Sequence, residues 1–333
     1  MRSTGKTRAF HPAHLGWAAL LGLLFCGCSS RGAQVLRVGY FDNLTHAQAL
    51  VGIQRGTFRE ALPGVEIRWK RFNAGPQAVE AMFAGDIDLA YLGPNPALNG
   101  YLRSNGAALR VLASACSGGA ALVVQPDLDF KGPRSLVGRR LATPQLGNTQ
   151  DVAARLWLQR AGLNPDGDVL VTPVENPDLP ALFQKKAVAG AWTVEPWVSR
   201  LVKAGGRVAL EESSLWPHGR YLTTVLAASG DLLARHPGWA RGFLTAHRQV
   251  TAWIRRNPAQ ARRLVRLQLA KDTGKDVDPA LLKSAWSRLD FDANLDPALL
   301  VRVAEHAQKL GFWKGALPKV EDVYVLDLPP ASR

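Results

Sequence analysis

Short apolar strands alternate with helix-forming segments along most of the chain, and this alternation limits the fold more than any other feature. Alternation of this kind produces mainly parallel sheets covered by helices on both faces, so the predicted class is α/β. Up to residue 125 we predict helices over Thr45–Leu62, with a break near Gly56, over Pro76–Ala84 and over Ala97–Ser104. The predicted strands are Val35–Phe41, Val65–Phe72, Ile87–Leu92, Leu109–Ala115 and Ala120–Gln125.

The alternation starts again in a second module near Pro126. Its predicted strands are Arg140–Thr143, Val169–Val174, Gly190–Val194 and Arg207–Leu210, with helices after Asn148 and over Leu179–Lys185 and Trp197–Ala204. The apolar strand Tyr221–Ala228 is interpreted as the return crossing, and the chain from Asp231 onward is predicted to be nearly all helical. We therefore predict one lobe from residues 35–125 and 226–333 and a second lobe from residues 126–225.

Polar or small loops follow the predicted strands in both modules. Ligands of such sheets bind outside the carboxyl ends of the strands. The sequence therefore predicts a ligand cleft between the modules. The loops that would line it are Asp42–His46, Asn73–Gly75, Gly93–Pro96, Ser114–Gly119, Gln145–Gln150 and Glu195–Trp197.

The segment LATPQLGNTQDVAARLWLQRAGL reads as a strand, a glycine-containing turn and a helix. Asn148 and Thr149 are good N-cap residues, and the first turn of a helix carries N–H groups without partners. Gly147 would let a ligand come close, and the side chains of Asn148, Thr149 and Gln150 add hydrogen-bonding groups, so we predict a seat for an anion or polar head group. The alternative is an ordinary capped helix. Asp151 would repel an anion unless its carboxylate points away.

Residues 1–28 have the organisation of an export signal. Basic residues precede the apolar run Leu15–Phe25, which is followed by Cys26-Gly27-Cys28. The run is short for a membrane span. The Gly27-Cys28 pair resembles the lipobox of bacterial lipoproteins, which implies lipidation of Cys28 and a location on the extracytoplasmic face of a membrane. The alternatives are a plain cleaved signal peptide and an uncleaved anchor; all three predict an exported protein.

The composition of the chain argues against several classes of protein and partner. The chain has 333 residues with 47% hydrophobic and 20% charged residues, as in a globular protein. Its formal charge of +14 becomes +11 without the basic residues of positions 1–27. We attribute this charge to solvated helix faces and expect no nucleic-acid partner. Without the leader only Cys28 and Cys116 remain, and no CxxC pair or HExxH motif occurs, so we predict neither a metal nor a cofactor.

Four segments in order resemble the extracytoplasmic substrate-binding proteins of the nitrate, taurine and aliphatic-sulfonate class of ABC importers. They are GYFDNLTHAQALVG, FNAGPQAVEAMFAGDIDLAYLGPNPAL, LATPQLGNTQDVAARLWLQRAGL and GAWTVEPWVSRLV. The resemblance implies a two-lobed type II periplasmic-binding-protein fold with a helical C-terminal segment. It also implies a monomer that closes around a small anionic ligand and delivers it to the transmembrane subunits of a permease.

Position by position, the resemblance implies ligand contacts from both lobes. Those of the first lobe are Asn43, Thr45, His46, Asn73, Gly75, Gly93, Asn95 and Pro96, and those of the second are Gly147, Asn148, Thr149, Gln150, Glu195 and Trp197. Two residues keep alternatives: His46 as a polar residue at a helix start, and Glu195 as a hinge or surface residue. Taurine would favour a carboxylate in the pocket, whereas nitrate or a plain alkanesulfonate would not.

The expected function is non-catalytic capture of an aliphatic sulfonate or taurine, with nitrate as the alternative ligand. An enzyme of the same fold is the competing hypothesis, similar to the pyrimidine synthases of thiamine biosynthesis or the enzymes of the menaquinone pathway. The export signal and the lack of a metal pair or a His/acid dyad beside a nucleophile favour a binding protein over an enzyme. A sensory or scaffold lipoprotein with a degenerate pocket is a third hypothesis.

Overall fold

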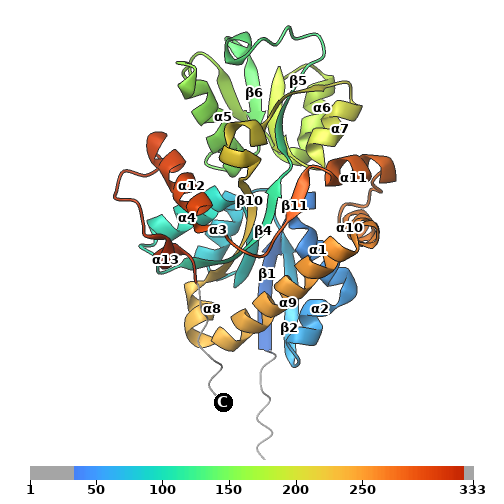
Figure 1. The fold of residues 1–333 in the computed structure, drawn as a ribbon, viewed down its shortest axis with the longest axis vertical. Coiled ribbons are helices and arrows are strands. Elements are labelled where there is room, and N and C mark those ends of the chain that lie inside the picture. Colours follow the sequence, from blue (N-terminus) through green and yellow to red (C-terminus); the bar gives the residue numbers. More distant parts are fainter. Residues whose placement is uncertain (1–33, 326–333) are drawn as a thin grey trace, which may run out of the picture. The chain divides into compact units, whose positions relative to one another are not determined.

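The computed structural model describes residues 34–325, so the predicted signal segment and Cys28 lie outside the described residues. Two mixed sheets organise this part of the chain (Figure 1). The first has the order β11-β4-β10-β3-β1-β2, in which β2, β1 and β3 are parallel and β10 runs antiparallel to its neighbours β3 and β4. Its strands are β1 (Gln34–Tyr40), β2 (Val65–Arg71), β3 (Leu89–Leu92), β4 (Leu109–Gly118), β10 (Leu222–Ser229) and β11 (Leu289–Phe291).

The second sheet has the order β7-β6-β8-β5-β9. The strands β7, β6 and β8 are parallel, and β5 runs antiparallel to β8 and β9. Its strands are β5 (Ala120–Val124), β6 (Arg140–Thr143), β7 (Leu170–Pro173), β8 (Gly190–Val194) and β9 (Arg207–Glu211). We call each sheet with its covering helices a lobe. The predicted α/β class is confirmed.

Helices cover both faces of the first sheet because alternate residues of its strands are apolar on both sides. Leu89 and Tyr91 of β3 belong to one core, while Ala90 and Leu92 belong to the other. The first core packs against α1 (Ala47–Arg55), α2 (Thr57–Ala61), α8 (Gly230–Arg235), α9 (Pro237–Arg256), α10 (Pro258–Thr273) and α11 (Pro279–Trp286). The second packs against α3 (Gly75–Phe83), α4 (Pro94–Arg103), α12 (Pro297–Lys309) and α13 (Val320–Val323).

The second sheet is also covered on both faces. The helix α5 (Thr149–Arg160) packs on one face through Ala154 and Leu158. The helices α6 (Leu179–Gln184) and α7 (Trp197–Lys203) pack on the other through Phe183 and Leu201. Short 3-10 helices lie at Leu44–His46, Pro133–Leu136, Asn176–Asp178, Glu212–Leu215 and Pro217–Gly219. The expected break at Gly56 is present, because Gly56 has a φ of 72° between α1 and α2.

The chain crosses between the sheets twice, at Gly118–Gly119 and at Arg220–Tyr221, which we call the crossing region. Gly118 and Gly119 have φ values of 80° and 78°, which favour glycine, and a Cβ on Gly118 would lie 2.4 Å from the backbone oxygen of Arg288. The predicted division after residue 125 assigned Ala120–Val124 to the first lobe. That assignment is wrong: β5 pairs within the second sheet, and an apolar pattern does not specify a strand's neighbours.

Candidate functional site

Two helix N-termini from different lobes face each other. The helix α4 follows the N-cap residue Gly93, and α5 follows the N-cap residue Asn148. A Cβ on Gly93 would lie only 2.3 Å from Thr149 Oγ1, so the first turn of α5 touches the loop that starts α4. The start of α3 lies beside them, because a Cβ on Gly75 would lie 2.4 Å from Pro96 Cγ. Helix N-termini attract anions through unpaired N–H groups and the helix dipole.

Three side-chain donors at these helix starts are buried without a partner. Asn95 Nδ2, Thr149 Oγ1 and Gln150 Nε2 form no hydrogen bond within the described residues. Their residues are only 7%, 5% and 4% exposed. Buried polar groups in proteins nearly always have a partner, and leaving a donor without one costs about 1–3 kcal/mol. These three donors, together with the buried acceptor Gln145 Oε1 in the loop before α5, are the side-chain groups at this place that remain available to hydrogen-bond a ligand.

Some of the hydrogen-bonding groups in the turn before α5 are already paired within the protein. Asn148 Oδ1 accepts from the Gln150 N–H at 3.0 Å and caps the helix. The Gly147 N–H donates to Asp151 Oδ2 at 2.9 Å, and a Cβ on Gly147 would meet no atom within 4 Å. Gly147 has a φ of 75°, which favours glycine, and the space beside its Cα is open. The Thr149 N–H has no acceptor among the described residues.

The carboxylate of Asp151 is fully buried, and its partners are groups of the second lobe. It accepts from Thr143 Oγ1 at 2.9 Å and from Arg155 Nε at 3.0 Å, and Arg155 Nη1 also reaches Asp166 at 2.8 Å. Burial raises the pKa of Asp151, and its hydrogen bonds and the Arg155 charge oppose that rise. The negative charge is balanced inside the second lobe, so Asp151 does not oppose an anion at the helix start.

The loop after β1 meets the second lobe through two hydrogen bonds. Trp197 Nε1 donates to Asn43 Oδ1 at 2.9 Å, and the Leu44 N–H donates to the backbone oxygen of Glu195 at 3.2 Å. Thr45 in the same loop is buried. These contacts bring together Asn43 and Trp197, two residues predicted to bind the ligand. Their side chains, however, are hydrogen-bonded to each other.

His46 is buried in the short helix that follows Asn43. Its ring stacks on Phe41 with a centroid distance of 4.4 Å, and Nδ1 accepts from the Phe41 N–H at 3.3 Å. Burial lowers the pKa of His46 to about 3, so the ring is neutral near pH 7 and carries its proton on Nε2. His46 therefore contributes no positive charge to the site.

The carboxylate of Glu195 is bonded to other side-chain and backbone groups of the protein. Its carboxylate accepts from the Ser199 N–H at 3.0 Å and from Ser199 Oγ at 2.9 Å, and Arg288 Nε lies 3.5 Å from it. Burial raises the pKa of Glu195, and the Ser199 bonds and Arg288 oppose that rise. Because both oxygens have partners, these contacts support the hinge alternative for Glu195 over a place in the ligand wall.

Asn73 contacts a residue that the sequence did not single out. Asn73 Nδ2 donates to Glu175 Oε2 at 2.7 Å, and Gln77 Nε2 lies 3.5 Å from Glu175 Oε1. Glu175 follows β7 at its carboxyl end, which is the only signal that could have identified it. Three pairs of loops thus meet across the lobes: those after β3 and β6, those after β1 and β8, and those after β2 and β7.

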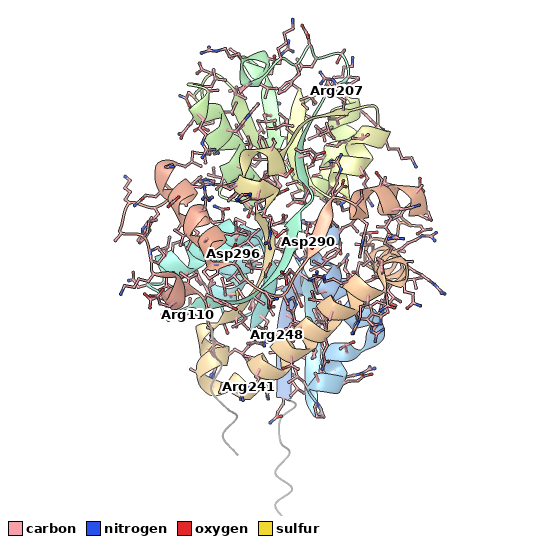
Figure 2. The ribbon with its side chains drawn as sticks, in the orientation of Figure 1. Arg110, Arg207, Arg241, Arg248, Asp290 and Asp296 are labelled. Atoms are coloured by element: carbon pink, nitrogen blue, oxygen red, sulfur yellow. The ribbon has the colours of Figure 1, made fainter. Side chains whose placement is uncertain are left out.

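Several surface cavities of the described residues lie elsewhere. One of about 530 Å³ is lined by Arg139, Arg140 and Lys186, and beside it Arg207, labelled in Figure 2, donates to the backbone oxygen of Leu128 at 2.9 Å. Another, of about 340 Å³, lies at the crossing region and is lined in part by Asp290 of β11, also labelled in Figure 2. The unpartnered donors instead lie where the two lobes are in contact.

Two further properties concern the described residues only. Within residues 34–325, no group of three or more His, Cys, Asp or Glu side chains could hold a metal ion. In the same part of the chain, no helix combines the length and apolar character that a membrane span requires.

Two lobes joined by two crossings, with polar strand ends in contact between them, define the type II periplasmic-binding-protein fold. The chain belongs to the NMT1-like family, whose sequence profile matches residues 30–269. The family resemblance predicted from the four segments is confirmed: the taurine, sulfonate and nitrate binding proteins of ABC importers are distant homologues.

Solved structures with this fold include binding proteins for different anions. The alkanesulfonate-binding protein SsuA from Xanthomonas axonopodis pv. citri, bound to MOPS, has a TM-score of 0.70 and 21% identity over 87% of this chain and 96% of that chain. The nitrate-binding protein NrtA from Synechocystis PCC 6803 has a TM-score of 0.73 and 16% identity over 89% and 87%. A DszB variant in complex with biphenyl-2-sulfinic acid also has the fold, with a TM-score of 0.62 and 18% identity over 87% and 96%.

Curated sequence relatives carry similar names. The taurine-binding periplasmic protein of Escherichia coli strain K12 is 26% identical over 180 residues, or 54% of this chain. That match spans about half the relative's length, 55%. A putative aliphatic sulfonates-binding protein of Bacillus subtilis strain 168 is 22% identical over 284 residues, covering 81% of this chain and 82% of that protein.

Proposed function

We propose that this protein is the extracytoplasmic substrate-binding component of an ABC importer. It captures a small anionic organosulfur ligand, an aliphatic sulfonate or taurine, between its lobes for delivery to a membrane permease. The observation that carries the proposal is the set of buried donors without partners, Asn95 Nδ2, Thr149 Oγ1 and Gln150 Nε2, at the facing starts of α4 and α5. The family membership and the names of the relatives support the same class.

The donor set fits a weakly basic oxyanion. A sulfonate spreads one negative charge over three oxygens, so neutral O–H and N–H donors can satisfy it without an ion pair. The unpaired N–H of Thr149 and the dipole of α5 add a favourable field. Nitrate has the same number of oxygens and accepts the same bonds, so it belongs in any test of the ligand.

Capture would depend on closure of the two lobes. Asn95 lies on the first lobe, whereas Thr149 and Gln150 lie on the second, so the ligand gains its full set of bonds only when the lobes meet. Binding then shifts an open-to-closed equilibrium by the difference in affinity between the two forms. The closed form is the one that would dock on the permease.

The test compares two substitutions at the start of α5. Thr149 is the first helical residue, where proline is well tolerated, and Asn148 before it has the extended conformation that proline requires (φ −67°, ψ 159°). Thr149→Pro therefore removes one N–H and one O–H but keeps the helix, whereas the control Thr149→Ser keeps both donors. We expect calorimetry to show at least tenfold weaker binding of taurine or ethanesulfonate for Thr149→Pro only.

Unchanged affinity in Thr149→Pro would contradict this site. The same titrations include nitrate and sulfate, and a ligand present at about 100 times its Kd should add about 2.7 kcal/mol to the stability of the wild type. Ligand recovered chemically altered after incubation would favour the enzyme hypothesis, because the fold by itself does not decide between binding and catalysis.

We also propose that Cys28 carries a lipid anchor that holds the protein at the extracytoplasmic face of a membrane. The proposal rests on the Gly27-Cys28 pair after the apolar run of the leader. Retention of the protein in a washed membrane fraction tests it, and recovery of all of the mature protein in the soluble fraction would contradict it.

A further inference from the structure

One contact between the lobes is exposed and involves a charged group. Glu175 Oε2 accepts from Asn73 Nδ2 at 2.7 Å, and Glu175 Oε1 lies 3.5 Å from Gln77 Nε2. Asn73 lies in the loop after β2 and Gln77 in α3, so both belong to the first lobe, whereas Glu175 follows β7 in the second. Two neutral amides of one lobe therefore hold a carboxylate of the other.

The first-lobe side of this contact is tied to the anion site. Asn73 lies two residues before Gly75, where a Cβ would lie only 2.4 Å from Pro96 Cγ. Pro96 is in the first turn of α4, next to Asn95, whose Nδ2 is one of the buried donors without a partner. The Asn73 N–H also donates to Gln77 Oε1 at 3.4 Å, which orients the Gln77 amide. The two amides and the start of α4 therefore form one packed unit.

The second-lobe side is tied to its own sheet. The Val174 N–H donates to the backbone oxygen of Thr143, the last residue of β6, at 2.7 Å. Asn176 is buried, and its Oδ1 accepts from Thr193 Oγ1 of β8 at 2.7 Å. Glu175 lies between these two anchored residues, and β6 leads into the turn before α5. Glu175 and the start of α5 should therefore move as one body when the lobes separate or meet.

An exposed contact of this kind forms and breaks without leaving a buried polar group unpaired. When the lobes separate, water takes the place of the two amides at the Glu175 carboxylate. When the lobes meet, the carboxylate gains hydrogen bonds that are stronger than those between neutral groups. The contact between Asn43 and Trp197 differs, because that hydrogen bond is buried. The Glu175 contact is therefore suited to adjust the balance between the open and closed forms.

We propose that Glu175, Asn73 and Gln77 form a latch that sets how long the closed form lasts. The inference rests on the proposed function, because it requires a ligand held between the lobes. The latch exists only when the lobes meet, so its loss should speed ligand release and leave the encounter of the ligand with the open form unchanged. It should act equally on every ligand that closes the protein. In this role Asn73 acts on closure and not on the ligand itself.

The experiment measures the release of taurine, ethanesulfonate and nitrate by stopped-flow tryptophan fluorescence. The variants are Asn73→Ala, Glu175→Ala and the double variant. The control Asp129→Ala removes an exposed carboxylate of the second lobe that pairs with Lys131 at 2.7 Å. We expect each single variant to release a bound ligand threefold to tenfold faster than the wild type and the control, with the association rate unchanged. The double variant should release it no faster than Glu175→Ala, because both remove the same bonds.

Three results would overturn the latch and leave the proposed function standing. They are release rates in both single variants that match the wild type, effects of the two variants that multiply in the double variant, and a change in the relative affinities of the three anions. If none of these anions binds the wild type at millimolar concentration, the proposed function fails, and the latch is judged on the free protein. Asn73→Asp sets two carboxylates against each other, so small-angle X-ray scattering should give it a larger radius of gyration than the wild type. Equal radii would then overturn the latch.

Discussion

The crossing region and the facing helix starts both contain polar groups and both lie between the lobes, but they differ in how these groups are satisfied. At the crossings, Arg288 Nη1 lies 3.0 Å from Glu211 and Thr223 Oγ1 donates to the Gly118 backbone oxygen at 2.6 Å. At the helix starts, Asn95, Thr149 and Gln150 have side-chain donors with no partner. Paired polar groups hold a structure together, and buried unpaired ones identify the place of a missing partner.

Glu212 tests whether an unpaired buried oxygen always means a ligand. Its Oε1 has no partner among the described residues, although Oε2 accepts from Trp192 Nε1 at 2.8 Å. Burial raises the pKa of Glu212 from 4.5 to about 7, so this carboxyl is mostly protonated below pH 7 and carries no charge there that a ligand would have to balance.

The expected consequence is a pH dependence of stability. Above pH 4.5 the unfolded chain releases the Glu212 proton, whereas the folded protein keeps it until about pH 7. The free energy of unfolding of the wild type should therefore fall by up to about 3 kcal/mol, relative to Glu212→Gln, as the pH rises from 4.5 to 7. Urea unfolding of both proteins across this range measures the difference, and a constant difference would show that Glu212 ionises normally.

Gly93→Ala should break the contact between the helix starts. The new Cβ would lie 2.3 Å from Thr149 Oγ1, and overpacking of this kind costs about 1–3 kcal/mol. The clash exists only when the lobes meet, so ligand affinity should fall about tenfold to a hundredfold while the unliganded protein unfolds almost as before.

Gly167→Ala is the matched control for Gly93→Ala. Gly167 lies on an exposed loop of the second lobe, and its new Cβ would meet only the side chain of Asn164. Calorimetry measures the ligand affinity of both variants, and thermal unfolding measures their stability. Equal affinities in Gly93→Ala and Gly167→Ala would mean that the ligand does not bind between these helix starts.

Glu195→Gln should lower the stability with little change in ligand affinity, which is the reverse of the result expected for Gly93→Ala. Gln retains an acceptor for Ser199 but removes the charge beside Arg288, so the free energy of unfolding should drop by about 1–2 kcal/mol. Ligand affinity should change less than threefold, because Glu195 is expected to act on the fold. Denaturant titration and calorimetry separate the two effects, and a tenfold loss of affinity at unchanged stability would return Glu195 to the ligand wall.

The sequence predicted the features that depend on local patterns. The αβ alternation, the break at Gly56 and the N-cap at Asn148 follow from apolar periodicity and from residue preferences at helix ends. It also identified five of the six loops that meet between the lobes, because strand ends can be read from the alternation, but not the loop after β7 that carries Glu175.

The features that it missed depend on partners distant in the chain. The strand β5 was assigned to the wrong sheet because its apolar pattern fits either one. The carboxylate of Glu195 lies near Arg288, which is distant in the sequence. The contact of Glu175 with Asn73 joins the two lobes. Nothing in the order GYFDN indicates that one oxygen of Asp42 is unpaired, since this depends on the atoms that surround it in the fold.

The inward orientation of Asp151 has a consequence for the conditions in which this protein works. Its charge is balanced by Arg155 within the lobe, so the helix start presents dipoles and neutral donors to the solute. Screening by dissolved ions weakens attraction between exposed charges much more than short contacts in a covered site. Retention of an anionic solute at the proposed site should therefore vary little between dilute and saline surroundings.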